Sequence, residues 1–372
     1  MRIAHITSDI DGRRNSGTAR VAAELIVELS RHIDVHQTFI HFCKSHEDIY
    51  KLSNTSEIII PLGNNWLCKR RSISFIKFFI NKQNRKKYGK FDVVHWHSSR
   101  LLPLFFLIPA KKIIITLHDA GHRLLPETNT FATHVHYWNL RLFLFKIDKV
   151  IAVSRMAMEQ INKFGHIPIK KLDFIYNGSY FGKLNPDMIS NFVVPERFII
   201  CVSRWQKHKN VESLIVAISL LQDYFRQTNT KLIVVGKPVC NYNLPERLIS
   251  DHQLEDLVIN LRNLSDENLA FLYERALLNI NPSLHEGFGL SVLEGMSRGC
   301  PSIVHQSTAT SEICGNSGIH IDMSNSHSIA FAIKQSLNNP DYLKKLKTLS
   351  IQRATQFTWE NAAHKLMKIY RE

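Results

Sequence analysis

Two glutamates, Glu286 and Glu294, flank a glycine-containing turn in the stretch HEGFGLSVLEG, residues 285–295. The pattern predicts a loop, EGFG, that runs into a helix ending near Gly299 and Pro301. A glycine-lined turn at the start of a helix exposes backbone N–H groups, and these groups together with the helix dipole suit a diphosphate. We therefore expect the backbone of this turn to bind an anion.

The two carboxylates need a different partner, because they repel phosphate oxygens. Glu294 falls in the second helical turn, beyond the first N–H groups, and suits neutral hydroxyls such as those of a ribose. Positive charge must then come from another segment. The stretch SRWQKHKN, residues 203–210, follows another apolar run and supplies Arg204 and Lys209, which could clamp a diphosphate and stabilise it as a leaving group.

The elements that must position these residues alternate along the chain. Short apolar runs such as RIAHIT, FDVVHWH, KIIITLH and KVIAVS are separated by helix-length segments, and a second series with RFIICVS, KLIVVG, LLNINPS and PSIVH repeats the arrangement. This alternation predicts βα units whose parallel sheets are covered on both faces. The irregular stretch GKLNPDMISNFVVPE, residues 182–196, has two prolines and no periodicity, so we place the domain boundary there.

The sequence thus predicts an α/β protein with two doubly wound domains. In such folds ligands bind at the carboxyl ends of the strands, and with two domains the site is expected in the cleft between them. Polar residues follow several of the expected strands; they include His97, His118, Asp119, Ser154 and Asn177 in the first half and Ser203, Arg204, Gly236 and Lys237 in the second.

The composition is that of an ordinary folded and soluble protein, with 44% hydrophobic and 21% charged residues. The six cysteines form no C-x-x-C pair and no zinc-like spacing with histidine, which favours a reducing compartment. The N-terminus lacks the apolar core of a secretion signal, and the most apolar stretch, LLPLFFLIPA, is broken by Pro103 and Pro109. We expect a cytoplasmic protein without a membrane-spanning segment.

The net charge of +15 is spread unevenly. The segment from Lys69 to Lys90 has nine Lys or Arg and no acid, and it surrounds the apolar block SISFIKFFI. Two interpretations stay open. The segment is an interfacial element on an anionic membrane, or it is a solvated helix whose Phe and Ile side chains pack on the protein's own core. Nucleic-acid binding is disfavoured, because the aromatics form one apolar block without a known nucleic-acid motif.

The chain resembles the retaining GT-B glycosyltransferases of family 4, whose hallmark is a Glu-x7-Glu motif. The resemblance rests on SRWQKHKNVESLIVA, NPSLHEGFGLSVLEGMSRGCPSIV and SEI in the second half, and on FDVVHWHSS, ITLHD, VIAVS, IYNGSYF and the terminal FTWENAAHKLMKIY, all in the family's order. It implies two Rossmann-like domains that face each other across a cleft. The two domains are an acceptor-binding domain, 1–184, and a nucleotide-sugar-binding domain, 185–355. A terminal helix, 356–372, would cross back to the first domain.

The resemblance also assigns roles at the donor site. Arg204 and Lys209 match the pair that binds the donor's diphosphate, and Glu294 matches the glutamate that holds the ribose. Glu286 lies beside the transferred sugar and His118 near the reacting sugar, and these two are the catalytic candidates. Further donor contacts are the backbone of Gly287, Phe288, Gly289 and Leu290, and Leu264 against the nucleobase.

On the side of the first domain the match has one departure. Ser16 and Gly17 stand where the family usually has a Gly-Gly pair, so Gly17 alone would approach the phosphates. His97 and Asp119 are candidates for the acceptor side.

No metal and no cofactor are expected besides the nucleotide-sugar co-substrate. His95 and His97 lie two apart on one strand face and could suggest a metal, but no third ligand is spaced to join them, so a structural or acceptor-lining role is favoured. The Asp9-x-Asp11 pattern follows the first strand of the domain that should not hold the diphosphate, and is read as chance.

The expected activity is that of a retaining hexosyltransferase. It would move a sugar, with mannose favoured, from a nucleotide diphosphate sugar to a saccharide acceptor, lipid-linked in the synthesis of a lipopolysaccharide O-antigen or capsule. The enzyme would then be peripheral at the inner face of the plasma membrane. Two alternatives stay open, namely a GT-B isomerase or phosphorylase, and a non-enzymatic protein that binds nucleotides or polyanions.

Overall fold

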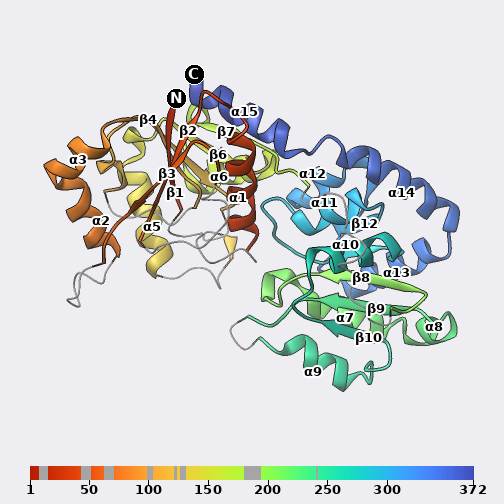
Figure 1. Cartoon of the computed structure of the whole chain (residues 1–372). Coiled ribbons are helices and arrows are strands. Elements are labelled where there is room, and N and C mark those ends of the chain that lie inside the picture. The colour runs from red at the N-terminus through yellow and green to blue at the C-terminus, as the bar shows by residue number, and fades with distance from the viewer. Residues whose placement is uncertain are drawn as a thin grey trace. The chain divides into compact units, whose positions relative to one another are not determined.

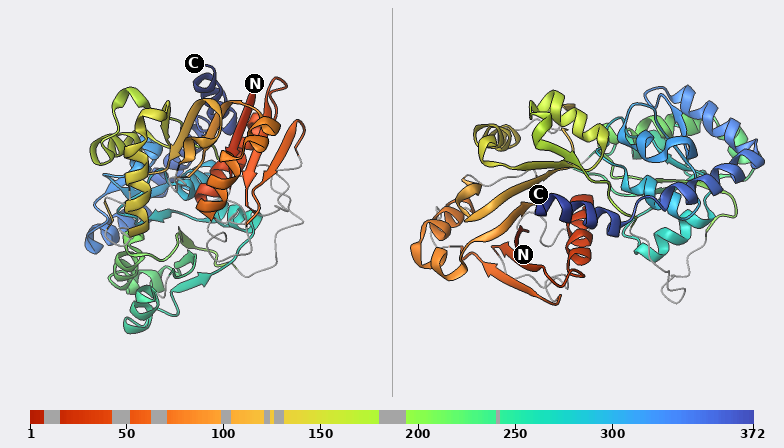
Figure 2. Two further views of the ribbon diagram at one scale, coloured as in Figure 1. Left: turned by 90° about the vertical axis from the view of Figure 1, so that its left-hand side faces the viewer. Right: turned by 90° about the horizontal axis from the view of Figure 1, so that it is seen from above.

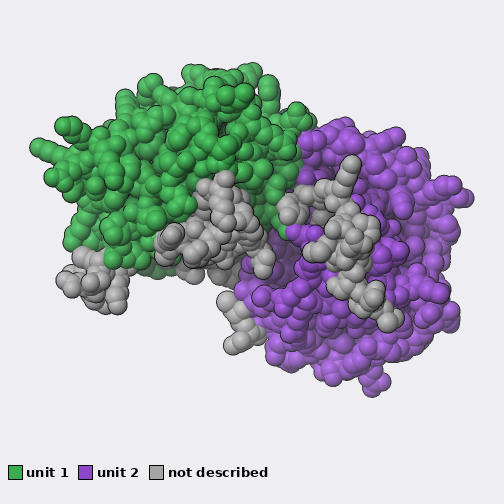
Figure 3. All heavy atoms as spheres, in the orientation of Figure 1, with its two compact units in different colours: residues 1–178, 359–372 green, residues 179–358 purple. Residues whose placement is uncertain are grey.

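The computed structural model describes residues 1–7, 16–42, 52–62, 71–98, 104–120, 124–125, 131–179, 194–239 and 242–372. The chain divides into two compact units, which Figure 3 colours separately. Unit 1 comprises Met1–Gly178 and Trp359–Glu372, and unit 2 comprises Ser179–Thr358. Most of the expected linker, 182–196, lies outside the described residues.

Unit 1 is built on a parallel sheet of seven strands in the order β3-β2-β1-β4-β5-β6-β7 (Figure 1). The order runs outward in both directions from the neighbours β1 and β4, which is the doubly wound topology that the alternating pattern predicts. The strands are β1 (Arg2–Ile6), β2 (His36–His41), β3 (Thr55–Ile59), β4 (Phe91–Trp96), β5 (Ala110–Leu117), β6 (Lys149–Ala152) and β7 (Leu172–Phe174).

The described helices of unit 1 follow the strands in turn. They are α1 (Gly17–Leu29), α2 (Arg71–Ile80), α3 (Lys82–Tyr88), α5 (Phe131–Leu142) and α6 (Arg155–Gly165), with short 3-10 turns η2 (Phe105–Leu107), η4 (Leu144–Lys146) and η5 (Ile169–Lys171). The last helix of the chain, α15 (Trp359–Arg371), also belongs to this unit and packs against α1.

Helix α15 is held to unit 1 by its apolar face and by polar contacts at its end. Leu366 is fully buried, and the ammonium group of Lys112 donates to the carbonyls of Ile369 and Tyr370 at 3.3 and 3.2 Å. A cation at the C-terminal carbonyls of a helix satisfies groups that have no partner within the helix. Arg371 adds a 3.0 Å ion pair with Asp34 at the exposed edge.

Unit 2 repeats the architecture with six parallel strands in the order β10-β9-β8-β11-β12-β13. The strands are β8 (Phe198–Val202), β9 (Lys231–Val235), β10 (Val258–Leu261), β11 (Asn279–Asn281), β12 (Ser302–His305) and β13 (Ile319–Ile321). The helices are α7 (Val211–Ser219), α8 (Gln222–Gln227), α9 (Leu244–Asp251), α10 (Asp266–Arg275), α11 (Leu290–Ser297), α12 (Ala309–Cys314), α13 (Ser326–Leu337) and α14 (Pro340–Ala354), with 3-10 turns η7 (Lys207–Lys209) and η8 (Gly315–Ser317).

Strand β8 shows why this sheet needs helices on both faces. Its residues 198–201 are all fully buried, and alternate side chains enter different cores. Ile199 and Cys201 pack in the cluster that includes residues of α7, α9 and α13, whereas Phe198 and Ile200 pack in a cluster with residues of α10. A strand that is apolar on both faces is typical of parallel sheets in α/β proteins.

The aromatic block of the basic segment packs inside unit 1. In α2, Phe75 is fully buried and Phe79 nearly so, and the Phe75 ring lies 5.9 Å from that of Trp96. Of the two open interpretations, the core role therefore holds for these side chains. No helix in the described part of the chain is both long and apolar enough to cross a bilayer. Among the described cysteines, Cys201, Cys300 and Cys314 are free and buried.

The anchoring of α15 can be tested with Leu366→Ala. Truncating a fully buried leucine leaves a cavity, so we expect a loss of about 2–5 kcal/mol in the free energy of unfolding, measured in urea by circular dichroism. Leu142→Ala, on an exposed helix face of the same unit, is the control and should change stability by less than about 0.5 kcal/mol. Equal effects of the two substitutions would contradict the buried position of Leu366.

Candidate active site

Helix α11 begins at Leu290, directly after the glycine turn, as the sequence pattern predicts. Gly289 is its N-cap and has φ of 97°, a left-handed conformation that side chains other than glycine rarely adopt. A Cβ atom at this position would lie 2.4 Å from the Cγ2 atom of Thr310. The first hydrogen bonds of the helix run from the N–H groups of Val292 and Leu293 to the Gly289 carbonyl. The N–H groups before Val292 therefore take no part in the hydrogen bonds of the helix itself.

Lys209 and Glu286 form an ion pair in unit 2, with 2.7 Å between Nζ and Oε1. Their side chains are 20% and 16% exposed, and the Ser283 hydroxyl donates to the same carboxylate oxygen at 3.0 Å. Burial raises the pKa of Glu286, but the charge and hydrogen bond of Lys209 and the Ser283 hydroxyl outweigh it and hold that pKa below its ordinary value. Glu286 is therefore a carboxylate at neutral pH.

Asn210 joins the two loops that carry this pair. Its backbone is left-handed, with φ of 53°, and its side-chain amide donates to the carbonyls of Pro282 at 3.2 Å and Met323 at 2.7 Å. A further backbone bond of 2.9 Å runs from Leu284 to the His208 carbonyl. The loop after β8 and the loop after β11 are thus tied together. Asn210 is not among the residues predicted from the sequence, although a left-handed conformation favours asparagine among non-glycine residues.

Arg204 follows β8, and its side chain is exposed. The neighbouring Trp205 is fully buried, and its backbone N–H donates to the Lys237 carbonyl at 3.0 Å in the loop after β9. Gly236 permits this approach, because a Cβ atom there would lie 1.9 Å from the Ser203 carbonyl oxygen. Arg204 and the ion pair accordingly come from adjacent strand ends of one sheet.

The remaining predicted donor contacts lie in the same unit. Glu294 is 5% exposed on α11, and Phe288 is buried with its ring 6.3 Å from that of Phe357. Phe288 thus has a packing role for its side chain, which leaves its backbone for the predicted contact. Leu264 is half-buried before α10, whose N-cap Ser265 accepts from the Asn268 N–H at 3.2 Å.

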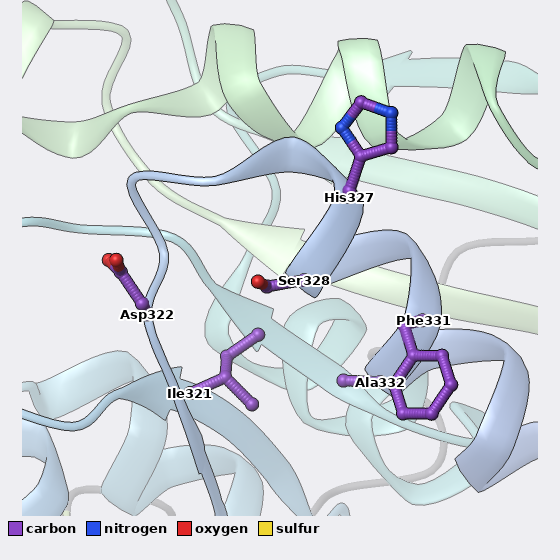
Figure 4. Close-up of a pocket in the computed structure, with 6 residues that line it drawn as sticks. All are labelled: Ile321, Asp322, His327, Ser328, Phe331 and Ala332. Carbon is purple, nitrogen blue, oxygen red and sulfur yellow. The ribbon is translucent and has the colours of Figure 1, made fainter.

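A pocket of unit 2 involves other residues. It is lined by the end of β13 and the start of α13, namely Ile321, Asp322, His327, Ser328, Phe331 and Ala332 (Figure 4). None of the predicted site residues lines it.

The predicted residues of the first domain all fall in unit 1. Gly17 is the first residue of α1, whose N-cap hydroxyl, on Ser16, accepts from the Ala19 N–H at 3.2 Å. The loop before it, with Asp9 and Asp11, lies outside the described residues. Asp119 follows β5 and is half-buried.

His118 also follows β5, and its Nε2 atom donates to the carbonyl of His97 at 3.2 Å. Because a carbonyl only accepts, Nε2 carries the ring proton. Burial lowers the pKa of His118, against the opposing effects of the His97 carbonyl and of Asp119, so the ring is neutral near neutral pH. Its Nδ1 atom is then an acceptor, suited to a sugar hydroxyl.

The expectation that His95 and His97 have no third imidazole beside them is wrong. His5 of β1 lies next to them, and ligand atoms of the three rings lie within 4.8 Å of one another. Spacing along the chain did not reveal this group, because β1 and β4 are neighbours in the sheet while His5 and His97 are 92 residues apart. These three histidines are called the histidine cluster below.

Hydrogen bonds within the histidine cluster favour the structural role. His5 Nδ1 and His97 Nε2 share a hydrogen bond of 2.9 Å. Burial raises the pKa of Tyr370 well above its ordinary value, so its hydroxyl stays protonated and donates to Nδ1 of His95, whose Nε2 then donates to Thr116 at 2.8 Å. Burial lowers the pKa of His5 to about 4 and those of His95 and His97 well below their ordinary value. The cluster is therefore neutral, and it connects β1, β4, β5 and α15.

The chain matches two family descriptions in succession. Residues 15–179 match Glycosyltransferase Family 4, and residues 187–357 match Glycosyl transferases group 1. Among solved structures, HepE of Anabaena in complex with UDP and glucose is 15% identical, with a TM-score of 0.77 over 100% of both chains. The two parallel sheets and this likeness confirm the predicted α/β fold class, GT-B.

Curated relatives match at low identity. The serotype-specific mannosyltransferase WbdA of Escherichia coli is 24% identical over 237 residues, which are 61% of this chain and 29% of WbdA. The chain thus spans less than a third of that relative. N-acetylgalactosamine-N,N'-diacetylbacillosaminyl-diphospho-undecaprenol 4-alpha-N-acetylgalactosaminyltransferase of Campylobacter jejuni is 23% identical over 359 residues, 95% of this chain and 96% of the relative.

The need for glycine at the start of α11 can be tested with Gly289→Ala. We expect about 1–3 kcal/mol of destabilisation in urea, because the new Cβ meets Thr310 and the backbone is strained. Adding Thr310→Ser removes the clashing methyl and should restore part of the loss. Gly165→Ala, where a Cβ meets only ordinary contacts, is the control and should be tolerated. Equal stability of Gly289→Ala and Gly165→Ala would rule out the constraint.

The ion pair predicts a pH dependence of stability. The pKa of Glu286 is below its ordinary value of 4.5, so its stabilising contribution is full above pH 4.5 and is lost as the pH falls through the lowered value. We expect Glu286→Gln to cost about 1–3 kcal/mol at pH 7, with a difference from wild type that narrows below pH 4.5. Glu274→Gln is the control, because Glu274 forms an exposed ion pair with Arg298. The stability of this variant should differ little from that of wild type at every pH. A gap that widens in acid would contradict the ion pair.

Proposed function

The chain belongs to glycosyltransferase family 4, and we propose that it transfers a hexose, with mannose favoured, from a nucleotide diphosphate sugar to a saccharide acceptor with retention at the anomeric carbon. One observation carries the proposal. The Lys209–Glu286 ion pair is half enclosed beside the start of α11, at the ends of strands β8 and β11. A cation, a carboxylate and a helix start at one place suit a phosphate and a sugar held side by side.

In the proposed reaction the bond between the anomeric carbon and the diphosphate breaks, and negative charge grows on the leaving phosphate. Arg204, Lys209 and the N–H groups at the start of α11 stabilise that charge. Glu294 accepts hydrogen bonds from the ribose, and Glu286, ionised by its contact with Lys209, accepts them from the transferred sugar. Neutral His118 accepts a hydrogen bond at Nδ1 from a sugar hydroxyl.

We also propose that the transfer needs no metal ion. Two side-chain cations and a helix start supply positive charge where many phosphate sites use a divalent cation. The rate in a chelator such as EDTA should therefore equal the rate in added Mg²⁺ or Mn²⁺.

The acceptor is proposed to be a lipid-linked saccharide in the synthesis of a cell-surface polysaccharide such as an O-antigen or capsule. The names of the relatives support this class, since one is a mannosyltransferase and another acts on a diphospho-undecaprenol saccharide. Such an acceptor requires the enzyme to work at a membrane surface. In the segment 71–90 the exposed cations of α3, including Lys82, Arg85 and Lys86, can contact anionic headgroups, whereas Phe75 and Phe79 are buried.

The decisive measurement compares Lys209→Ala with Lys207→Ala, which removes an exposed lysine from the same 3-10 turn. With purified protein, GDP- or UDP-sugars and a lipid-linked acceptor, we expect Lys209→Ala to lower kcat/KM by about 10²–10³-fold and Lys207→Ala to leave it within a few-fold. NMR should show that the anomeric configuration of the product is the same as that of the donor, as retention requires.

Other results would change the assignment. An inverted product would overturn retention, and sugar conversion without an acceptor would indicate an isomerase. Nucleotide binding without conversion of any donor, with cellular function intact in Lys209→Ala, would indicate a non-enzymatic binder.

A further inference from the structure

Helix α5 exposes a row of large apolar side chains. Phe131, Val135, Trp138 and Leu142 are between 43% and 85% exposed. They follow one another at intervals of four, three and four residues, and because an α-helix has 3.6 residues per turn they share one face. Single exposed apolar residues are common, but a contiguous row on one helix face marks a contact surface.

The opposite face of α5 fixes the helix to unit 1. Tyr137 and Leu140 are each only 4% exposed, and the Tyr137 hydroxyl donates to the carbonyls of Phe164 and Gly165 at the end of α6. Helix α5 therefore has two apolar faces. One packs in unit 1, and the other is exposed to solvent.

Two further exposed apolar side chains lie in the 3-10 turns η4 and η5. Phe145 of η4 is 71% exposed and Ile169 of η5 is 61% exposed. The ammonium group of Lys171 donates to the carbonyls of Leu144 and Ile147, so the two turns adjoin. We call Phe131, Val135, Trp138, Leu142, Phe145 and Ile169 the α5 surface.

The charged residues next to the α5 surface are mainly positive, with one exposed acid, Asp148, just after η4. The sequence from Phe131 to Lys146 contains no acid, and Arg141, Lys146 and Lys170 are exposed. The Lys146 ammonium group lies 5.5 Å from the centre of the Phe145 ring. A second copy of the chain would bring like charges together at this face, in a protein of net charge +15. An anionic bilayer complements both the charge and the apolar row.

We propose that the α5 surface inserts into the interfacial layer of an anionic phospholipid membrane. Tryptophan, phenylalanine and leucine on one face with arginine and lysine at its border are the chemistry of helices that lie in a bilayer interface. Figures 1 and 2 show α5 with α2 and α3 toward the same side of unit 1, so the cations of α3 add to the attraction. The inference deepens the proposed function, on which its biological meaning rests, because a lipid-linked acceptor is reached at such a surface.

Vesicle flotation tests the proposal. Wild-type protein should bind vesicles of phosphatidylglycerol and phosphatidylethanolamine, and should bind pure phosphatidylcholine at least ten-fold more weakly. Trp138→Ser and, separately, Leu142→Ser should each lower binding to the anionic vesicles by about ten-fold. The matched control is Phe331→Ser, an exposed phenylalanine on helix α13 of unit 2 (67% exposed), which should bind as wild type does. Circular dichroism of each variant should match wild type, because the substituted side chains are exposed.

Quenching of tryptophan fluorescence by brominated phospholipids locates the contact. Of the four tryptophans in the described part of the chain, Trp96, Trp205 and Trp359 are buried, whereas Trp138 is 64% exposed. The fifth, Trp66, lies outside the described residues, so the measurement uses a Trp66→Phe background. In that background we expect quenching and its loss on adding Trp138→Phe, although the variant keeps an aromatic ring and should still float with the vesicles.

Three results would overturn the inference. They are equal flotation of wild type, Trp138→Ser and Leu142→Ser; equal binding to phosphatidylcholine and anionic vesicles; and a dimer in light scattering that Trp138→Ser or Leu142→Ser abolishes, which would make this face a contact between copies. Assays on a soluble acceptor analogue keep the two proposals apart. Vesicle binding without sugar transfer would sink the proposed function alone, and transfer to the analogue without vesicle binding would sink the α5 surface alone.

Discussion

The site proposed for the donor depends on one buried amide. Asn210 places its side chain between two loop carbonyls, and this fixes the turn that carries Lys209 against the loop that carries Glu286. A half-buried charge pair is stabilising only where its geometry is good and further hydrogen bonds satisfy the carboxylate, a condition that Ser283 helps to meet. Without the amide, the two loops would have only one backbone bond, from Leu284 to His208, among the cross-links described above.

Lys209 and Glu286 in unit 2 are charged, whereas the buried histidine cluster in unit 1 is neutral. In unit 2 a cation and an anion face each other, so Glu286 stays charged. Among the described residues of unit 1, no carboxylate forms an ion pair with the histidine cluster; burial keeps its rings neutral, and His5 and His97 share a hydrogen bond. One consequence concerns α15, the last helix of the chain, whose Tyr370 donates to His95 in the middle of the sheet. The cluster therefore also anchors the end of the chain, 275 residues away from His95 in sequence.

The apolar side chains of α2 and those of the α5 surface have different roles. Phe75 and Phe79 of α2 are buried and stabilise unit 1, whereas the side chains of the α5 surface are exposed to solvent, which is unfavourable for a large apolar patch. Composition could not separate them, because both segments combine Phe or Leu with Lys or Arg. Only the packing of α5 against α6 shows which of its faces is free of the protein's own core.

The sequence by itself determined the order of strands and helices along the chain and the start of α11. Alternating apolar runs predicted two parallel sheets, and the turn before Leu290 predicted the helix start with its essential Gly289, because these features depend on residues close together in the chain. Tertiary structure decided what depends on distant residues, namely the Lys209–Glu286 contact, the role of Asn210, and the approach of His5 to His95 and His97. Strand order brings such residues together, and no spacing along one segment encodes it.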